Sequence, residues 1–144
     1  MSSFREIAFR LLIAFILGGV IGFEREKKGR SAGLRTHILV SAGSCLIMLV
    51  SLYIYELYKQ EVALDPGRIA AGVVTGIGFL GAGTIIRSAQ EVRGLTTAAS
   101  VWLSAAIGLA VGCGFLSGAF ITTIIALLTL LVLKPLERKL EQIR

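Results

Sequence analysis

Apolar stretches long enough to cross a bilayer alternate with short polar stretches along the whole chain. A hydrocarbon core about 30 Å thick needs about 17–25 residues of helix, and a helix in lipid satisfies its own backbone. With 144 residues, of which 55% are hydrophobic, little chain remains for a separate soluble domain. We therefore predict an all-α integral membrane protein with a single transmembrane domain over residues 1–144, a compact bundle of about five helices. The predicted spans are residues 4–23, 36–58, 69–86, 96–112 and 115–133.

The basic residues lie mostly on one side of these predicted spans. Cytoplasmic loops carry an excess of Lys and Arg. With the N-terminus outside, eleven of the fifteen bases face the interior, which predicts an N-out, C-in orientation. The eleven are Arg25, Lys27, Lys28, Arg30, Arg35, Arg87, Arg93, Lys134, Arg138, Lys139 and Arg144. A four-span arrangement, in which Arg10 keeps the first stretch on the membrane surface, is the alternative.

The short basic runs beside the spans bear on the partners of the chain. Juxtamembrane bases attract anionic lipid headgroups, and here they are not gathered on a soluble amphipathic face. We therefore expect anionic lipids at the inner face as partners, and no nucleic acid. After Pro135, residues 134–144 place Leu136, Leu140 and Ile143 at helical spacing, which predicts a short amphipathic helix on the inner surface.

Five glycines fall within residues 72–83, inside the third predicted span. Each glycine costs about 0.8–1 kcal/mol relative to alanine within a helix, so local helix stability does not select them. Gly72 and Gly76 have the spacing that lets membrane helices approach closely. The other interpretation is a broken helix that lines a cavity, because irregular backbone survives at membrane depth only where protein or water satisfies it.

The inner ends of the second and fourth predicted spans are alike. Gly33-Leu34-Arg35 opens one and Gly94-Leu95-Thr96 opens the other, which suggests a parallel repeat of two helical hairpins. Thr36, Thr96 and Thr97 are good N-cap residues, and capping is one interpretation of them. The other is an anion site, because two helix N-termini with free N–H groups would face the basic side, where a lipid phosphate or a soluble phosphorylated ligand could bind.

Several kinds of chemistry have no support in the sequence. The acidic residues avoid the middle of every predicted span, whereas an ion pathway usually needs carboxylates within the membrane. His37 is the single histidine and makes no transition-metal site alone. No catalytic triad or phosphate loop occurs. We therefore expect a protein that is not an enzyme and has no cofactor, and the sequence does not identify metal ligands.

Several motifs occur in a fixed order and together resemble those of the MgtC/SapB family of bacterial inner-membrane proteins. The resemblance covers residues 15 to 115. It rests on Gly22-Phe-Glu-Arg-Glu26, Ala32-Gly-Leu-Arg-Thr-His37, Asp65-Pro-Gly-Arg-Ile-Ala-Ala71, Gly76-Ile-Gly-Phe-Leu-Gly-Ala-Gly83 and Arg93-Gly-Leu-Thr-Thr-Ala-Ala99.

The resemblance implies a multi-pass protein of the bacterial plasma membrane that is linked to Mg²⁺ homeostasis and adaptation to low Mg²⁺, with a regulatory role. Longer relatives continue into a soluble cytoplasmic domain, so this chain, ending at Arg144, is similar to a short form without it. The family motifs fall on the residues that we take as the candidate functional surface. These are Glu24, Arg25, Arg35, Thr36, His37, Asp65, Arg68, Gly76, Gly78, Phe79, Gly81, Gly83, Arg93, Gly94, Thr96 and Thr97.

Two further hypotheses concern transport and assembly. The glycine-rich span and the repeat would also suit a small channel or transporter for Mg²⁺ or another small solute. We expect a homodimer, built through the Gly72/Gly76 or the Gly108/Gly112 face, because the glycines offer more close-approach surface than one small bundle needs. The competing account is that the third and fourth spans use these glycines against each other. A membrane-protein partner is also expected.

Overall fold

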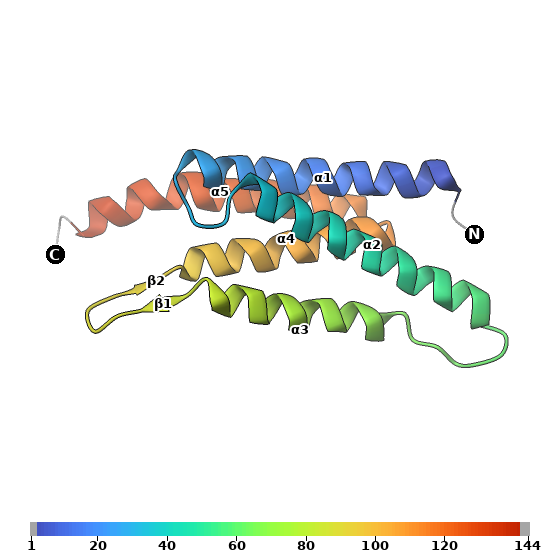
Figure 1. Ribbon diagram of the computed structural model, residues 1–144. Helices are drawn as coiled ribbons and strands as arrows, with labels where there is room; N and C mark the ends of the chain where they lie inside the picture. The colour runs from blue at the N-terminus through green and yellow to red at the C-terminus, as the bar shows by residue number, and fades with distance from the viewer. Residues whose placement is uncertain (1–2, 142–144) are drawn as a thin grey trace.

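The computed structural model describes residues 3–141, and the side chains of residues 3–133. Its elements run side by side as an elongated bundle (Figure 1). They are α1 (Phe4–Lys27), α2 (Leu34–Tyr58), α3 (Gly67–Gly83), β1 (Ile86–Arg87), β2 (Val92–Arg93), α4 (Leu95–Cys113) and α5 (Leu116–Glu141). One end of the bundle holds the α1–α2 loop, the β1–β2 hairpin and the end of α5, and we call it the basic end.

The predicted all-α membrane bundle is confirmed. In the described part of the chain, α1, α2, α4 and Leu116–Leu133 of α5 are long and apolar enough to cross a membrane. The remaining helix, α3, is apolar but shorter, with 17 residues. At 1.5 Å per residue it rises about 25 Å, which lies at the lower limit for a span. The orientation in the membrane stays a prediction.

Small residues hold α1, α2 and α4 together at the centre of the bundle. A Cβ atom at Gly18 of α1 would lie 2.6 Å from the His37 carbonyl oxygen of α2. A Cβ atom at Gly112 of α4 would lie 2.7 Å from the Cys45 carbonyl oxygen, and one at Gly108 would overlap that of Ser41. Only glycine permits such close approach of helix backbones, so these positions fix the spacing of the three helices.

The glycine-rich helix α3 is continuous from Gly67 to Gly83, so the interpretation as a broken helix is wrong. It also ends earlier than predicted. The Thr84 hydroxyl donates to the Gly81 carbonyl at 2.8 Å, and Ile86 pairs with Arg93 in an antiparallel two-stranded hairpin. The β-branched pair Ile85-Ile86 favours strand over helix. The prediction missed this end of the helix because residues 69–86 form one continuous apolar run.

The hairpin returns to α4 through Gly94, whose φ of +93° is in the left-handed region. A Cβ atom there would overlap the carbonyl oxygen of Thr84. A glycine is therefore required on both counts, and it brings the hairpin directly onto the first turn of α4.

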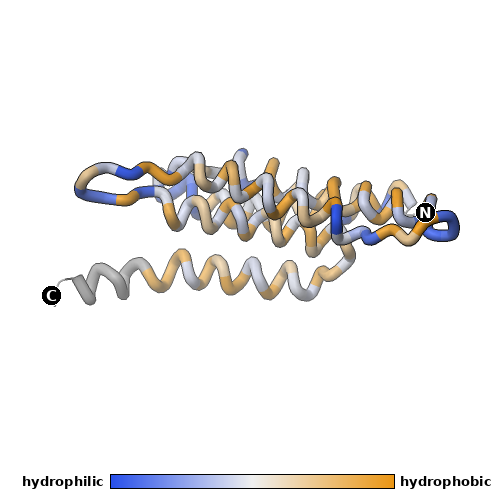
Figure 2. The backbone as a smooth tube through the Cα atoms, turned by 90° about the horizontal axis from the view of Figure 1, so that it is seen from below, coloured by the Kyte–Doolittle hydropathy of each residue, from blue (hydrophilic) through white to orange (hydrophobic). Residues whose placement is uncertain are grey.

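The last helix, α5, lies along one side of the other four helices (Figure 2). A tight turn at Gly114, with φ of +90°, joins it to α4. The predicted tail does not form a separate element up to Glu141, since residues 134–141 continue α5. Residues 142–144 lie outside the described part of the chain.

The two hairpins suggested by the sequence run in the same direction. Both α2 and α4 start at the basic end directly after a glycine (Figure 1). Their N-caps differ, however, because Gly33 has φ of −109° and Gly94 has φ of +93°. The repeat therefore stays a prediction.

Candidate functional site

A polar cavity of about 470 Å³ opens at the basic end, between the end of α1, the β1–β2 hairpin and the first turn of α4. It brings together five of the sixteen residues of the predicted surface. Its lining consists of Arg25, Arg30, Glu91, Val92, Arg93, Gly94, Leu95, Thr96 and Thr97.

Arg25 is the buried basic residue of the cavity lining, with 3% of its surface exposed. Its Nη2 donates a long hydrogen bond, 3.4 Å, to the Thr97 hydroxyl oxygen, and its Nη1 lies 3.8 Å from Oε2 of Glu24. Its Nε has no hydrogen-bond partner within the described residues. A buried charge is costly unless it is paired and hydrogen-bonded, and these contacts compensate Arg25 only in part.

Glu24 is buried beside Arg25 and is the only buried acidic residue of the described side chains. Nζ of Lys28 lies 2.7 Å from Glu24 Oε1 and also donates to the Leu130 carbonyl at 3.2 Å. The geometry of the Glu24–Lys28 pair is that of a charge contact, because neither Glu24 oxygen accepts an aligned hydrogen bond in the described part of the chain. Glu24 is thus neutralised by two neighbouring cations.

His37 is completely buried at the junction of α1, α2 and α4. Its Nδ1 donates to the Gly33 carbonyl at 2.8 Å, and its Nε2 lies 3.1 Å from the Ser100 hydroxyl oxygen. That hydroxyl also lies 2.9 Å from the Thr97 carbonyl oxygen, but its single proton serves one acceptor at a time. His37 therefore links the start of α2 to the first two turns of α4.

The two helix N-termini at the basic end differ. Gly33 and Gly94 are the N-cap residues, and neither Thr36, Thr96 nor Thr97 caps a helix, so that interpretation is wrong. Each N-cap lies two or three residues before the threonines that were candidates for it. Glu26 instead reaches across from α1, where its Oε2 accepts a hydrogen bond from the Leu34 backbone N–H at 2.7 Å. The N-terminus of α2 is therefore already occupied by a carboxylate.

The N-terminus of α4 faces the cavity without a side-chain cap. The nearest carboxylate of the lining is Glu91 of the hairpin, which accepts a hydrogen bond from Arg93 Nε at 2.7 Å. Both side chains are more than half exposed, with 54% and 75%. Three bases and one acid thus line the cavity, which leaves it with an excess of positive charge.

Other members of the predicted surface lie elsewhere. Asp65 and Arg68 are at the opposite end, where they line a cavity of about 290 Å³ between α2 and the start of α3. Oδ1 of Asp65 accepts a hydrogen bond from the Gly67 backbone N–H at 2.7 Å. Arg35 and Thr36 are exposed on α2 and line neither cavity. The sixteen residues therefore do not form one site.

The glycines of α3 were expected to pack closely, and most of them do not. Around Gly72, Gly76, Gly78 and Gly83, no atom of the described residues lies within 4 Å of an added Cβ. Gly81 alone meets a neighbouring helix, at Ala98 of α4, and Phe79 is 81% exposed. The account in which α3 and α4 use these glycines against each other is therefore wrong.

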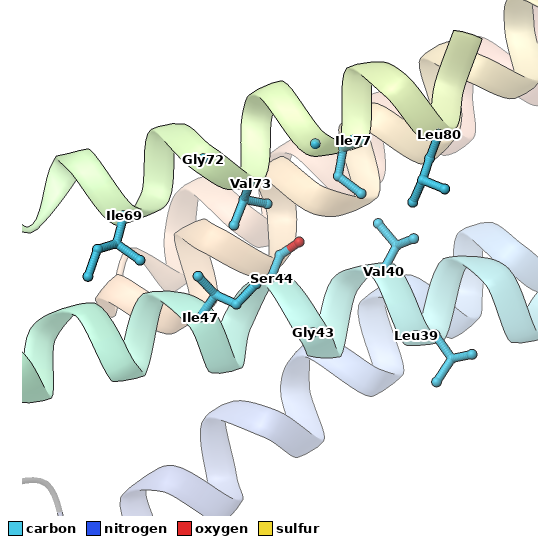
Figure 3. Close-up of a pocket in the computed structure, with 11 residues that line it drawn as sticks. Leu39, Val40, Gly43, Ser44, Ile47, Ile69, Gly72, Val73, Ile77 and Leu80 are labelled. Carbon is cyan, nitrogen blue, oxygen red and sulfur yellow. The ribbon is translucent and has the colours of Figure 1, made fainter. Parts of the chain in front are cut away.

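A groove of about 490 Å³ lies between α2 and α3, and Figure 3 shows its two walls. Val40 and Ile47 of α2 face Val73 and Ile77 of α3 across it. Ser44 is the one side chain of the lining with a polar group. The groove can hold an apolar chain, but it offers almost no ligand for an ion.

Four residues of the basic end were not predicted: Glu26, Lys28, Arg30 and Ser100. The first three belong to the same charged run as Arg25. Glu26 contacts Leu34 of α2, Lys28 contacts Leu130 of α5, and Arg30 lines the cavity together with the first turn of α4. Ser100 and Ser104 follow Thr97 at helical spacing and are both buried, a periodicity that was open to detection. Among the described residues, no three His, Cys, Asp or Glu side chains gather as a metal site would require.

The sequence is similar to known proteins over nearly its full length. The profile of the MgtC family matches residues 11–139. "Putative magnesium transporter YhiD" of Escherichia coli (strain K12) is 47% identical over 137 residues, and "Protein MgtC" of Brucella abortus (strain 2308) is 44% identical over 128 residues. "Protein MgtC" of Salmonella typhimurium (strain 14028s / SGSC 2262) is 44% identical over 133 residues.

These alignments cover 94%, 89% and 92% of this chain, but only 64%, 51% and 54% of the respective relatives. The chain thus spans between about half and two thirds of the length of these proteins. No solved structure matches it significantly.

Proposed function

The chain belongs to the MgtC family, and from this premise we propose that it is a non-enzymatic membrane protein that regulates adaptation of the bacterium to low Mg²⁺. It is a multi-pass bacterial membrane protein, as its family and its four long apolar helices show. The observation that carries the proposal is the match over residues 11–139 to a family with magnesium-related names.

The state of the buried acidic residue favours regulation over Mg²⁺ transport. Mg²⁺ is bound through carboxylate and other oxygen ligands. Glu24, the buried carboxylate of the described part, lies 2.7 Å from Lys28 Nζ and beside the Arg25 guanidinium. Two cations already compensate its charge, so a divalent cation would have to displace them.

Transport of Mg²⁺ or another small solute is the second candidate. The printed name of the Escherichia coli relative, "Putative magnesium transporter YhiD", favours it. Against it stands the groove between α2 and α3, which is lined by apolar side chains apart from Ser44. A hydrated cation would find almost no oxygen ligand there.

Two measurements separate the candidates. Deletion of the gene should slow growth at low Mg²⁺, added Mg²⁺ should restore it, and purified protein in liposomes should pass no Mg²⁺. Growth that is the same at all Mg²⁺ concentrations would contradict the regulatory role. Mg²⁺ flux that is lost in Gly81→Leu would instead establish transport. A pull-down from membranes would then identify the membrane-protein partner of a regulator.

We also propose that the protein is a homodimer. Gly108 and Gly112 cannot form the interface, because both already pack against α2. Gly72 and Gly76 remain available, because both are exposed, line the open groove between α2 and α3, and have the spacing of a close helix crossing. Mass measurement in mild detergent tests this: a monomer that persists at high protein concentration would contradict the dimer.

A further inference from the structure

We propose that the polar cavity at the basic end is a binding site for a phosphate group, held by Arg25, Arg30, Arg93 and the first turn of α4. The inference goes beyond the proposed role in Mg²⁺ adaptation and does not depend on it. It rests on the open N-terminus of α4, the buried guanidinium of Arg25 and the charge of the cavity lining.

The first turn of α4 offers backbone donors that no side chain of the helix satisfies. The first four N–H groups of a helix have no intrahelical acceptor, and the helix dipole adds positive potential there. Gly94 is the N-cap and has no side chain to accept from them. The matching groups of α2 are different, because Glu26 already occupies that N-terminus. Of these two N-termini, only that of α4 is open to an external anion.

Arg25 is an independent indication of an anionic ligand. Only 3% of its surface is exposed, it lines the cavity, and its Nε has no partner among the described residues. Its two other contacts, 3.4 Å to Thr97 Oγ1 and 3.8 Å to Glu24 Oε2, are long. A guanidinium offers five donors in a planar fork that matches phosphate oxygens. A phosphate in the cavity would give Arg25 the acceptor that it lacks.

The other charged residues of the lining fit the same ligand. Arg30 and Arg93 are exposed at the mouth, where they can move to meet an anion. Glu91 shares the lining, and its carboxylate accepts a hydrogen bond from Arg93. Because three bases face one acid, one negative charge from a phosphate diester or two from a monoester can be accommodated.

The surroundings of the cavity permit two sources of the phosphate group. Leu95 and Val92 line the cavity and are 57% and 47% exposed, and Ile86 of the paired strand is 68% exposed. Exposed apolar side chains beside a basic cavity suit the surface of a bilayer, where a lipid headgroup would enter from the side. A soluble phosphate would enter from the aqueous phase. Both would place the same oxygens against the same donors.

The experiment uses the full chain in phosphatidylcholine nanodiscs. One arm adds phosphatidylglycerol to the discs, and the other adds sodium phosphate at constant ionic strength; the melting temperature is measured in both. The test variant is Arg30→Gln with Arg93→Gln. The control is Arg35→Gln with Arg87→Gln, which removes the same charge at the same end from exposed residues outside the cavity. All four residues are exposed, so both variants should fold.

We expect at least one anion to raise the melting temperature of the native chain and of the control. The test variant should need at least tenfold more of that anion for the same rise. A response to phosphatidylglycerol alone identifies a lipid headgroup, and a response to sodium phosphate identifies a soluble ligand. Equal responses of the two variants would reduce the effect to general surface charge and overturn the proposal. A native chain that responds to neither anion would overturn it as well.

Discussion

The central helices and α3 use glycine in opposite ways. In α1 and α4, Gly18, Gly108 and Gly112 lie so close to α2 that an added Cβ would overlap or nearly overlap its backbone. In α3, Gly72 and Gly76 have open space where a side chain would be. The same residue type is therefore indispensable for packing in one region, whereas Gly72 and Gly76 have no packing role inside the protomer in the other.

The two regions differ in whether packing offsets the cost of a glycine within a helix. Every glycine in a helix interior loses about 0.8–1 kcal/mol relative to alanine. At the centre, close contact between helix backbones offsets that loss. Along α3, whose buried residues are only Val73, Ile77 and Gly81, no contact inside the protomer does so for Gly72 and Gly76. The compensation that we propose for α3 is contact with a second copy.

The largest effect should come from Gly108→Ala. The new methyl group would overlap the Ser41 carbonyl oxygen, and Ser44 Cβ would lie 2.9 Å away. Overpacking of this kind costs about 1–3 kcal/mol, and we expect the upper end because backbone has to move. The free energy of unfolding in mixed micelles measures it. Gly78→Ala, which meets no atom within 4 Å, is the matched control. Equal losses in the two variants would abolish the contrast between the regions.

His37→Leu tests whether the central region depends on polar contacts as well as close approach. The change removes the hydrogen bond to the Gly33 carbonyl and leaves the Ser100 hydroxyl without its imidazole partner. The Ser100 hydroxyl keeps the Thr97 carbonyl as an acceptor, so the cost is that of the two lost hydrogen bonds. Each contributes about 0.5–1.5 kcal/mol, so we expect a loss of about 2 kcal/mol in the free energy of unfolding. The double variant with Ser100→Ala should lose less than the sum of the single variants. Strict additivity would show that the two side chains are not coupled.

Gly76→Ala should have the opposite sign from Gly108→Ala. With open space around the new methyl group, the helix gains about 0.8–1 kcal/mol from propensity. This gain is expected for the monomer, at low protein concentration. If α3 is the dimer interface, Gly76→Leu should shift the measured mass toward the monomer at higher concentration. A stable dimer in Gly76→Leu would place the interface elsewhere and leave the α3 glycines unexplained.

The smallest effect should come from Thr36→Ala. Thr36 is exposed and caps no helix, so the unfolding free energy should change by less than about 0.5 kcal/mol, as for ordinary surface substitutions. Glu26→Ala is the informative comparison, because alanine has no side-chain oxygen to accept from the Leu34 N–H. Its loss should approach about 1 kcal/mol, the usual cost of a helix cap. A larger loss in Thr36→Ala would reverse our assignment of the α2 cap.

Hydropathy was sufficient to predict the helices of the bundle. An apolar stretch of about 20 residues has few alternatives in lipid, so four long helices followed from the sequence. The boundaries of α3 did not, because Ile85 and Ile86 are as apolar as a helix requires. Hydropathy does not distinguish a short strand from the last turn of a helix.

The candidate site was predicted in part. Arg25, Arg93, Gly94, Thr96 and Thr97 do line one cavity. Glu26 occupies the N-terminus of α2 and leaves that of α4 open. This difference depends on a contact between α1 and α2, so no residue spacing within one helix predicts it. The packing role of each glycine likewise depends on which neighbour faces it, so Gly76 and Gly108 cannot be told apart by sequence.

Lys28 has a consequence for how α5 is held along the membrane normal. Most contacts of α5 with its neighbours are apolar, and apolar surfaces tolerate sliding past one another. The ammonium of Lys28 is different, because Glu24 fixes it on α1 while it donates to the Leu130 carbonyl of α5. A slip of part of a helical turn, whose pitch is about 5.4 Å, would carry that carbonyl out of reach before the carbonyl of the next turn replaced it. The partly buried ammonium of Lys28 thus opposes small axial displacements of a helix that otherwise packs through apolar side chains.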